Sequence, residues 1–194
     1  MFLWISSIVP VLTLVVTGFG AIEAIRGDHT AHRMTEVYFQ DCFLPLSAGE
    51  VLDGGALEPV TEDLARGFMS DSTGRAWMAR NVHVSLTEMR SKNEAALYGC
   101  AVQWHSDLDG HRAIDFDQVI QFYGEFLSEM VEDGFFLEIK QCKEADGSML
   151  WVYESRMPES RPFRTVLSYR PEVHFLLLIA AESGVAGRLD SCAY

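Results

Sequence analysis

The most regular pattern of hydrophobic positions lies between Asp115 and Gly134. Apolar residues recur there at intervals of three and four, and the positions between them are polar or acidic, which is typical of a helix with one buried side. Asp115 is suited to cap its start and Gly134 to end it. We therefore predict a helix that packs against a sheet through Phe116, Val119, Ile120, Tyr123, Phe126, Leu127, Met130 and Val131.

Two further helices are predicted nearer the N-terminus. Residues 29–46 place Met34, Cys42 and several aromatic residues on one side, and Pro45 marks the approximate end. Residues 56–69 read as a shorter helix with Pro59 in its first turn, and Val60, Leu64 and Phe68 on one face. The stretch "SDSTG" at 70–74 would break this helix.

Alternation with a period of two predicts the strands. Two lie at 77–89 and 95–105, joined by a polar turn, and the remainder of the chain adds strand candidates at 135–143, 149–156, 163–170 and 173–181. Asp146 and Gly147 form a good hairpin signal between two of them.

This order of elements predicts an α+β fold, an antiparallel sheet covered on one face by helices. The order ββ-α-βββ(β) after the two helices is similar to profilin-like, roadblock/longin-like and PAS-like layouts. That similarity concerns the order of elements alone and implies no function.

The opening segment carries no charged side chain from Met1 to Ile22, which is long enough for a helix to cross a bilayer. We expect residues 1–24 to be a single-pass membrane anchor or uncleaved signal, and residues 25–194 to form a single α+β domain. The alternatives are a cleaved signal peptide, which would leave an exported protein, and a true start at Met34.

Orientation is indicated by two conflicting signals. Arg26 and Arg33 follow the segment, and positive charge there favours a cytoplasmic domain. The four cysteines favour the opposite side, because they are far apart and compatible with long-range disulfides. We predict the pairs Cys42–Cys100 and Cys142–Cys192 and an extracytoplasmic, periplasmic domain; four buried free thiols are the alternative.

The net charge of the chain limits the kinds of partner that it can bind. With 28 acidic and 15 basic residues, the formal net charge is −13, so we expect no nucleic-acid partner, because phosphate binding needs clustered Lys and Arg. The best candidate for metal chemistry is "WHSDLDGHR", although Asp and Gly are also ordinary turn residues. No metal or cofactor is predicted, with weak metal candidates at His105, Asp107, Asp109 and His111.

Other histidines are interpreted as structural. His29 and His32 lie one helical turn apart beside the predicted anchor, whereas His83 and His174 each stand alone in a predicted strand. No serine, cysteine or lysine stands in a recognisable nucleophile motif. We therefore assign no catalytic residue and expect no enzyme.

Two functional hypotheses follow. The first is a membrane-anchored interaction module, an accessory or assembly subunit that contacts other membrane protein subunits. The second is a PAS-like sensory domain that binds a small ligand in a pocket lined by Trp104, Phe126 and Trp151.

Overall fold

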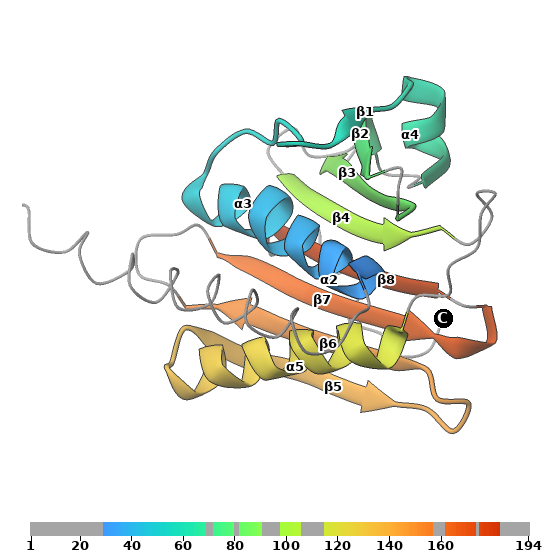
Figure 1. Ribbon diagram of the computed structural model, residues 1–194. Helices are drawn as coiled ribbons and strands as arrows, with labels where there is room; N and C mark the ends of the chain where they lie inside the picture. Colours follow the sequence, from blue (N-terminus) through green and yellow to red (C-terminus); the bar gives the residue numbers. More distant parts are fainter. Residues whose placement is uncertain are drawn as a thin grey trace, which may run out of the picture.

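The computed structural model describes residues 29–68, 72–79, 82–90, 98–105, 115–156, 162–173 and 175–182. They form an α+β arrangement with one large antiparallel sheet and a few helices, as the sequence predicts at that level (Figure 1). Within these ranges no helix is both long enough and apolar enough to span a membrane. The predicted anchor at residues 1–24 lies outside them.

The first helical segment is continuous but changes its winding. It comprises α2 (His29–Glu36), the π-helical stretch η1 (Val37–Phe43) and α3 (Leu44–Ala48), and it ends at Gly49, whose φ is 71°. The helix thus continues beyond Pro45, where the sequence predicted its end. The wider π-helical turn before Pro45 accommodates a ring that would clash with a carbonyl in a regular α-helix.

The next segment corrects the predicted helix at 56–69. Glu58 and Pro59 form a short strand, β1, which pairs with β2, and helix α4 is confined to Glu62–Phe68. Ala65 is its buried residue, whereas Leu64, expected on the buried face, is 43% exposed.

Three strands then replace the two that were predicted between 77 and 105. These are β2 (Ser72–Ala79), β3 (Val84–Arg90) and β4 (Tyr98–Trp104). The predicted strand at 77–89 contains a turn at Val82 and His83, and the predicted break at 70–74 overlaps the start of β2.

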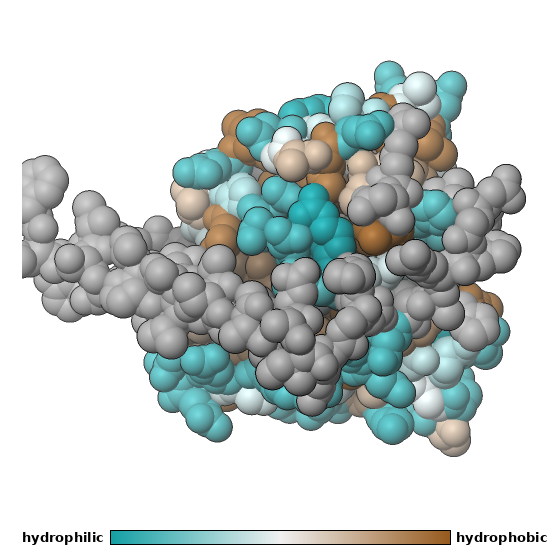
Figure 2. Space-filling view, in the orientation of Figure 1, coloured by the Kyte–Doolittle hydropathy of each residue, from teal (hydrophilic) through white to brown (hydrophobic). Residues whose placement is uncertain are grey.

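Helix α5 (Phe116–Glu132) matches its prediction. The Asp115 side chain accepts a hydrogen bond from the Gln118 backbone N–H at 3.0 Å, and Gly134 follows the helix with a φ of 77°. The predicted apolar side is buried or half-buried except for Val131, which is 37% exposed. Figure 2 shows hydrophilic residues over α5 and β5, in the lower part of that view.

The second half of the sheet also follows the predicted strands closely. It consists of β5 (Phe136–Lys143), β6 (Met149–Ser155), β7 (Phe163–Arg170) and β8 (Phe175–Glu182), with the short 3₁₀ helix η2 (Pro171–Val173) before β8. The predicted hairpin turn is present at Asp146 and Gly147, where the Asp146 side chain accepts from the Ser148 N–H at 2.8 Å.

The strand order β1-β2-β3-β4-β8-β7-β6-β5 divides the sheet into two consecutive four-stranded meanders. Each is preceded by a helix, and the last strands of the two meanders, β4 and β8, pair at the centre. They approach closely there, since a Cβ built on Gly99 would lie 2.7 Å from the Ala181 Cβ.

The two faces of the sheet carry different cores. One face, here called the helix face, packs against α2, η1, α3 and α5 in the front of Figure 1. Aromatic rings dominate it, with Phe126 4.3 Å from Phe39 and 5.7 Å from Phe43 between ring centroids. The opposite, second face carries an aliphatic cluster, defined as Met89, Ala101, Leu150, Val152, Val166, Leu177, Ile179 and Ala181.

Candidate functional site

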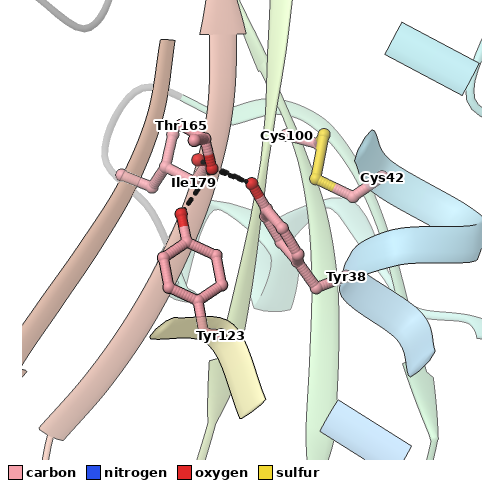
Figure 3. Close-up of a disulfide and its surroundings, with 6 residues drawn as sticks. All are labelled: Tyr38, Cys42, Cys100, Tyr123, Thr165 and Ile179. Carbon is pink, nitrogen blue, oxygen red and sulfur yellow. Dashed lines mark hydrogen bonds between the residues drawn. A yellow bond between two sulfur atoms is a disulfide. The ribbon is translucent and has the colours of Figure 1, made fainter. Parts of the chain in front are cut away.

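A disulfide joins the first helix to the centre of the sheet on the helix face. Cys42 on η1 and Cys100 on β4 are bonded, with Cα atoms 5.7 Å apart and both side chains fully buried (Figure 3). The structure therefore brings together one pair that the sequence analysis predicted. Cys142 is half-buried on β5, but Cys192 lies outside the described residues, so the second pair stays a prediction.

Three hydroxyl groups meet in the core near this disulfide (Figure 3). The Thr165 hydroxyl on β7 hydrogen-bonds both Tyr38 of η1 and Tyr123 of α5. Tyr38 also donates to the Ile179 carbonyl at 3.3 Å. Because all three hydroxyls are buried and bonded, they tie both main helices to the sheet.

Burial also sets the ionisation of these tyrosines. Loss of solvent raises the pKa of both Tyr38 and Tyr123 well above the ordinary value, even though the hydrogen bonds with Thr165 act in the opposite direction. Both phenols are therefore neutral at physiological pH.

Asp41 is a half-buried carboxyl on η1. Desolvation raises its pKa to about 6, with Glu36 and Asp53 raising it further and Arg33 lowering it. A Cβ on Gly55 would collide with the Asp41 carboxylate, so the loop after α3 packs directly against this group. The carboxyl therefore changes charge slightly below neutral pH.

A serine and a histidine are hydrogen-bonded on the second face. The Ser85 Oγ of β3 lies 2.7 Å from His105 Nε2 at the end of β4, and the His105 ring lies 4.4 Å from the Phe68 ring of α4. This is the spacing of a nucleophile and its base. Ser85 has no exposed surface, however, so a substrate cannot reach its hydroxyl in this conformation.

Two neighbouring polar groups have no hydrogen-bond partner among the residues that the structure describes. They are Thr87 Oγ1, on the same face of β3 as Ser85, and Gln103 Oε1, on the strand position that pairs with Ser85. A buried water is the ordinary partner for such groups. The patch is therefore a hydrogen-bonded serine–histidine pair beside two polar atoms for which the described residues supply no partner.

The predicted metal candidates lie mostly outside the described residues, so their grouping stays a prediction. Of the four, His105 is described and bonds Ser85, while Asp107, Asp109 and His111 lie outside the described residues. Among the residues that the structure describes, no group of three His, Cys, Asp or Glu side chains could hold a metal ion.

The remaining histidines were also assigned from the sequence. His83 is in the turn between β2 and β3 with a φ of 54°, which corrects its predicted place within a strand. His32 lies on α2, and the His29 side chain and His174 are outside the described part.

The aromatic residues expected to line a ligand pocket pack against other side chains. Phe126 lies within the phenylalanine cluster of the helix face, and Trp104 contacts Phe116 with ring centroids 5.4 Å apart. Trp151 lies against α5, where a Cβ on Gly124 would be 3.1 Å from its ring.

One acidic side chain is fully buried on the helix face. Glu88 of β3 is 1% exposed, and its carboxylate lies 3.2 Å from the Arg75 guanidinium and accepts from the Thr73 hydroxyl at 2.9 Å. Arg75 also donates to the Leu52 carbonyl at 2.8 Å. The buried charge is thus compensated, and it fixes the loop after α3 to the sheet.

Both edges of the sheet are unsuited to strand addition, by different means. At one edge β1 has only two residues, one of which is Pro59, which cannot donate a ladder hydrogen bond. At the other edge β5 is interrupted by an irregularity between Glu138 and Lys140, and its side chains include charged groups.

Comparison of the chain with protein-family models, with curated proteins and with solved structures found no match.

Proposed function

We propose that the protein is a membrane-anchored, extracytoplasmic interaction module, an accessory or assembly subunit of a membrane protein complex. The disulfide between Cys42 and Cys100 carries the proposal. Disulfides persist in oxidising compartments and are rare where glutathione keeps thiols reduced. Because this one lies in the core, the folded domain fits the extracytoplasmic side of a membrane.

The position of the disulfide relative to the apolar segment supports attachment. The helix that carries Cys42 begins at His29, a few residues after the uncharged stretch that ends at Ile22. A retained segment of that length would hold the domain close to the bilayer surface. The domain would then face partners that are themselves in the membrane.

Contact through the span itself is favoured over contact through the sheet edges. The two-residue strand β1 and the irregular strand β5 disfavour strand pairing at the edges of the sheet. The apolar segment, in contrast, contains small residues that let helices pack closely in lipid. These residues are Ser6, Ser7, Thr13, Gly18 and Gly20.

A topology assay tests the compartment. A reporter enzyme that is active only outside the cytoplasm, fused after Tyr194, is expected to be active, and a fluorescent protein that folds only in the cytoplasm is expected to be dark. The reverse pattern would contradict the proposal. Intact mass of the membrane-extracted protein should include Met1 and the apolar segment, and a mass that lacks them would leave an exported, unanchored protein.

Extraction in mild detergent tests the partner. The full-length chain should copurify with membrane proteins in a fixed ratio, and replacing Gly18 and Gly20 by Leu should abolish this while keeping the segment apolar. A Leu3→Ile variant is the matched control and should retain the partners. A full-length protein that copurifies with nothing, or partners that ignore the glycine substitutions, would overturn docking through the span.

A further inference from the structure

The aliphatic cluster on the second face is buried although all of its members lie on strands. Their exposed fractions range from 0% to 6%. The helix-face helices lie on the other side, and α4 contacts β2 and β3, away from β6 and β7. A sheet face excludes water only when a second layer covers it, so another segment of the chain must cover this one.

The pattern of burial on β5 to β8 shows where that segment runs. Val166 and Val152 pair with each other near the middle of the face and are fully buried. At the end of β8, Ala181 pairs with Arg164, which pairs in turn with Glu154 and then Leu137 across the sheet. This row is more exposed to solvent, because Arg164 and Glu154 form a half-buried ion pair and Leu137 is 38% exposed. Burial therefore continues along a diagonal and leaves one corner of the face open.

The diagonal joins two informative points. One end is Ala181, beside Glu182, where β8 and the described chain end. The other end is Cys142 on β5, which packs against the aliphatic cluster and pairs with Leu150. From β8 to β5 the face is three strands wide, about 14 Å, and the offset of four residues along the strands adds about 13 Å. The diagonal is thus roughly 20 Å long.

The chain beyond β8 has the length and the cysteine to follow this path. Cys192 is the tenth residue after Glu182, and ten extended residues reach about 33 Å. The intervening residues include Val185 and Leu189, which supply apolar side chains.

We propose that residues 183–194 cross the second face from β8 to β5 as a strap, fastened by a disulfide between Cys142 and Cys192. The strap covers the aliphatic cluster and gives the sheet its second layer. To form the bond, the two thiols lose two protons and pass two electrons to an acceptor disulfide, such as oxidised glutathione or an oxidoreductase. The bond needs an oxidising environment, but the strap does not depend on a membrane partner.

Hydroxyl-radical footprinting of the purified full-length protein, oxidised with glutathione disulfide, tests this inference. The compared variants are the wild type, Cys192→Ala and a chain ending at Glu182. The readouts are Ile179 on the second face and its neighbour Leu178 on the helix face, which are 1% and 0% exposed. Their adjacency makes Leu178 the matched control for any general loss of folding.

In the wild type both residues should be protected. In the shortened chain Ile179 should become at least about threefold more reactive while Leu178 stays protected, and Cys192→Ala should give an intermediate value. Equal protection of Ile179 in all three proteins would overturn the strap, because another segment would then cover the face. If the shortened chain does not fold, the strap is tested by two other results. It is overturned if Ile179 is as protected in Cys192→Ala as in the wild type and Cys142 of the wild type is in no disulfide.

Discussion

The two faces of the sheet are closed in different ways. On the helix face, α2, η1, α3 and α5 supply a thick aromatic layer, a buried disulfide and a hydroxyl network that ties both helices to the strands. On the second face, aliphatic side chains of the strands form a thin layer with no described helix over its centre. The helix face is therefore closed by described helices, whereas the cover of the second face is the strap proposed above.

We therefore expect substitutions on the helix face to destabilise the whole domain. Substitutions on the second face should expose that face to solvent without unfolding the domain. Changes on the helix face act on contacts that are complete within the described residues. Changes on the second face should act in proportion to how firmly the proposed strap is fastened.

The largest effect is expected from removal of the helix-face disulfide. Cys42 and Cys100 are 58 residues apart, for which the chain-entropy model assigns roughly 4 kcal/mol of stabilisation. The Cys42→Ala/Cys100→Ala variant should lose about that free energy of unfolding in urea titrations. The control variant Cys142→Ala/Cys192→Ala should lose the same amount when reductant is added, and no response to reductant there would contradict the assignment.

The next prediction compares Leu178 and Ile179, neighbours on opposite faces of β8. Truncation of Leu178 to Ala should cost about 2–5 kcal/mol, because it opens a cavity in the helix-face core. Its cost should not change when Cys192 is also replaced by Ala. Truncation of Ile179 to Ala should cost at least about 1 kcal/mol less in the Cys192→Ala background than in the wild type. The reason is that the effects of two substitutions add when the residues are far apart, and fail to add when the residues share contacts. If the cost of truncation is unchanged by Cys192→Ala at both Leu178 and Ile179, the proposed difference between the two faces is contradicted.

Thr165→Val tests the hydroxyl network of the helix face. The substitution keeps the shape but leaves two buried tyrosine hydroxyls without their shared partner, so it should cost about 1–3 kcal/mol in thermal or urea unfolding. Tyr123→Phe should cost less, because Thr165 keeps its bond to Tyr38. A greater loss for Tyr123→Phe than for Thr165→Val would contradict the central position of Thr165.

The smallest effect concerns Asp41 and pH. Its folded pKa of about 6 lies above the ordinary value of 3.8, so the folded state binds a proton at higher pH than the unfolded chain. Stability from this group should therefore rise as the pH falls from about 7 to about 4. Asp41→Asn should be more stable than the wild type at pH 7, and the difference should shrink toward pH 4.

The elements that the sequence predicted well are those with a long, uninterrupted pattern. Helix α5 carries its apolar stripe over 17 residues between clear cap residues, and the strands from β5 to β8 are separated by turn residues. The pair Cys42 and Cys100 was also predictable, because each shares an apolar side with neighbouring core residues.

The misplaced elements lacked a local signal. The turn between β2 and β3 passes through His83 in a left-handed conformation without a glycine, and Val82 and Val84 preserve the alternation across it. Pro59 suits the first turn of a helix as well as an edge strand, and its pairing with Trp77 decided the outcome. The contact between Ser85 and His105 depends on strand register, which no spacing along the chain reveals.

Non-reducing peptide mapping of protein taken from its native compartment tests the central claim most directly, that the domain is closed on both faces under oxidising conditions. We expect one linked peptide pair containing Cys42 and Cys100 and a second containing Cys142 and Cys192, with no thiol available to an alkylating reagent. Four alkylated cysteines would contradict it and would return the domain to the cytoplasmic side, which Arg26 and Arg33 favour.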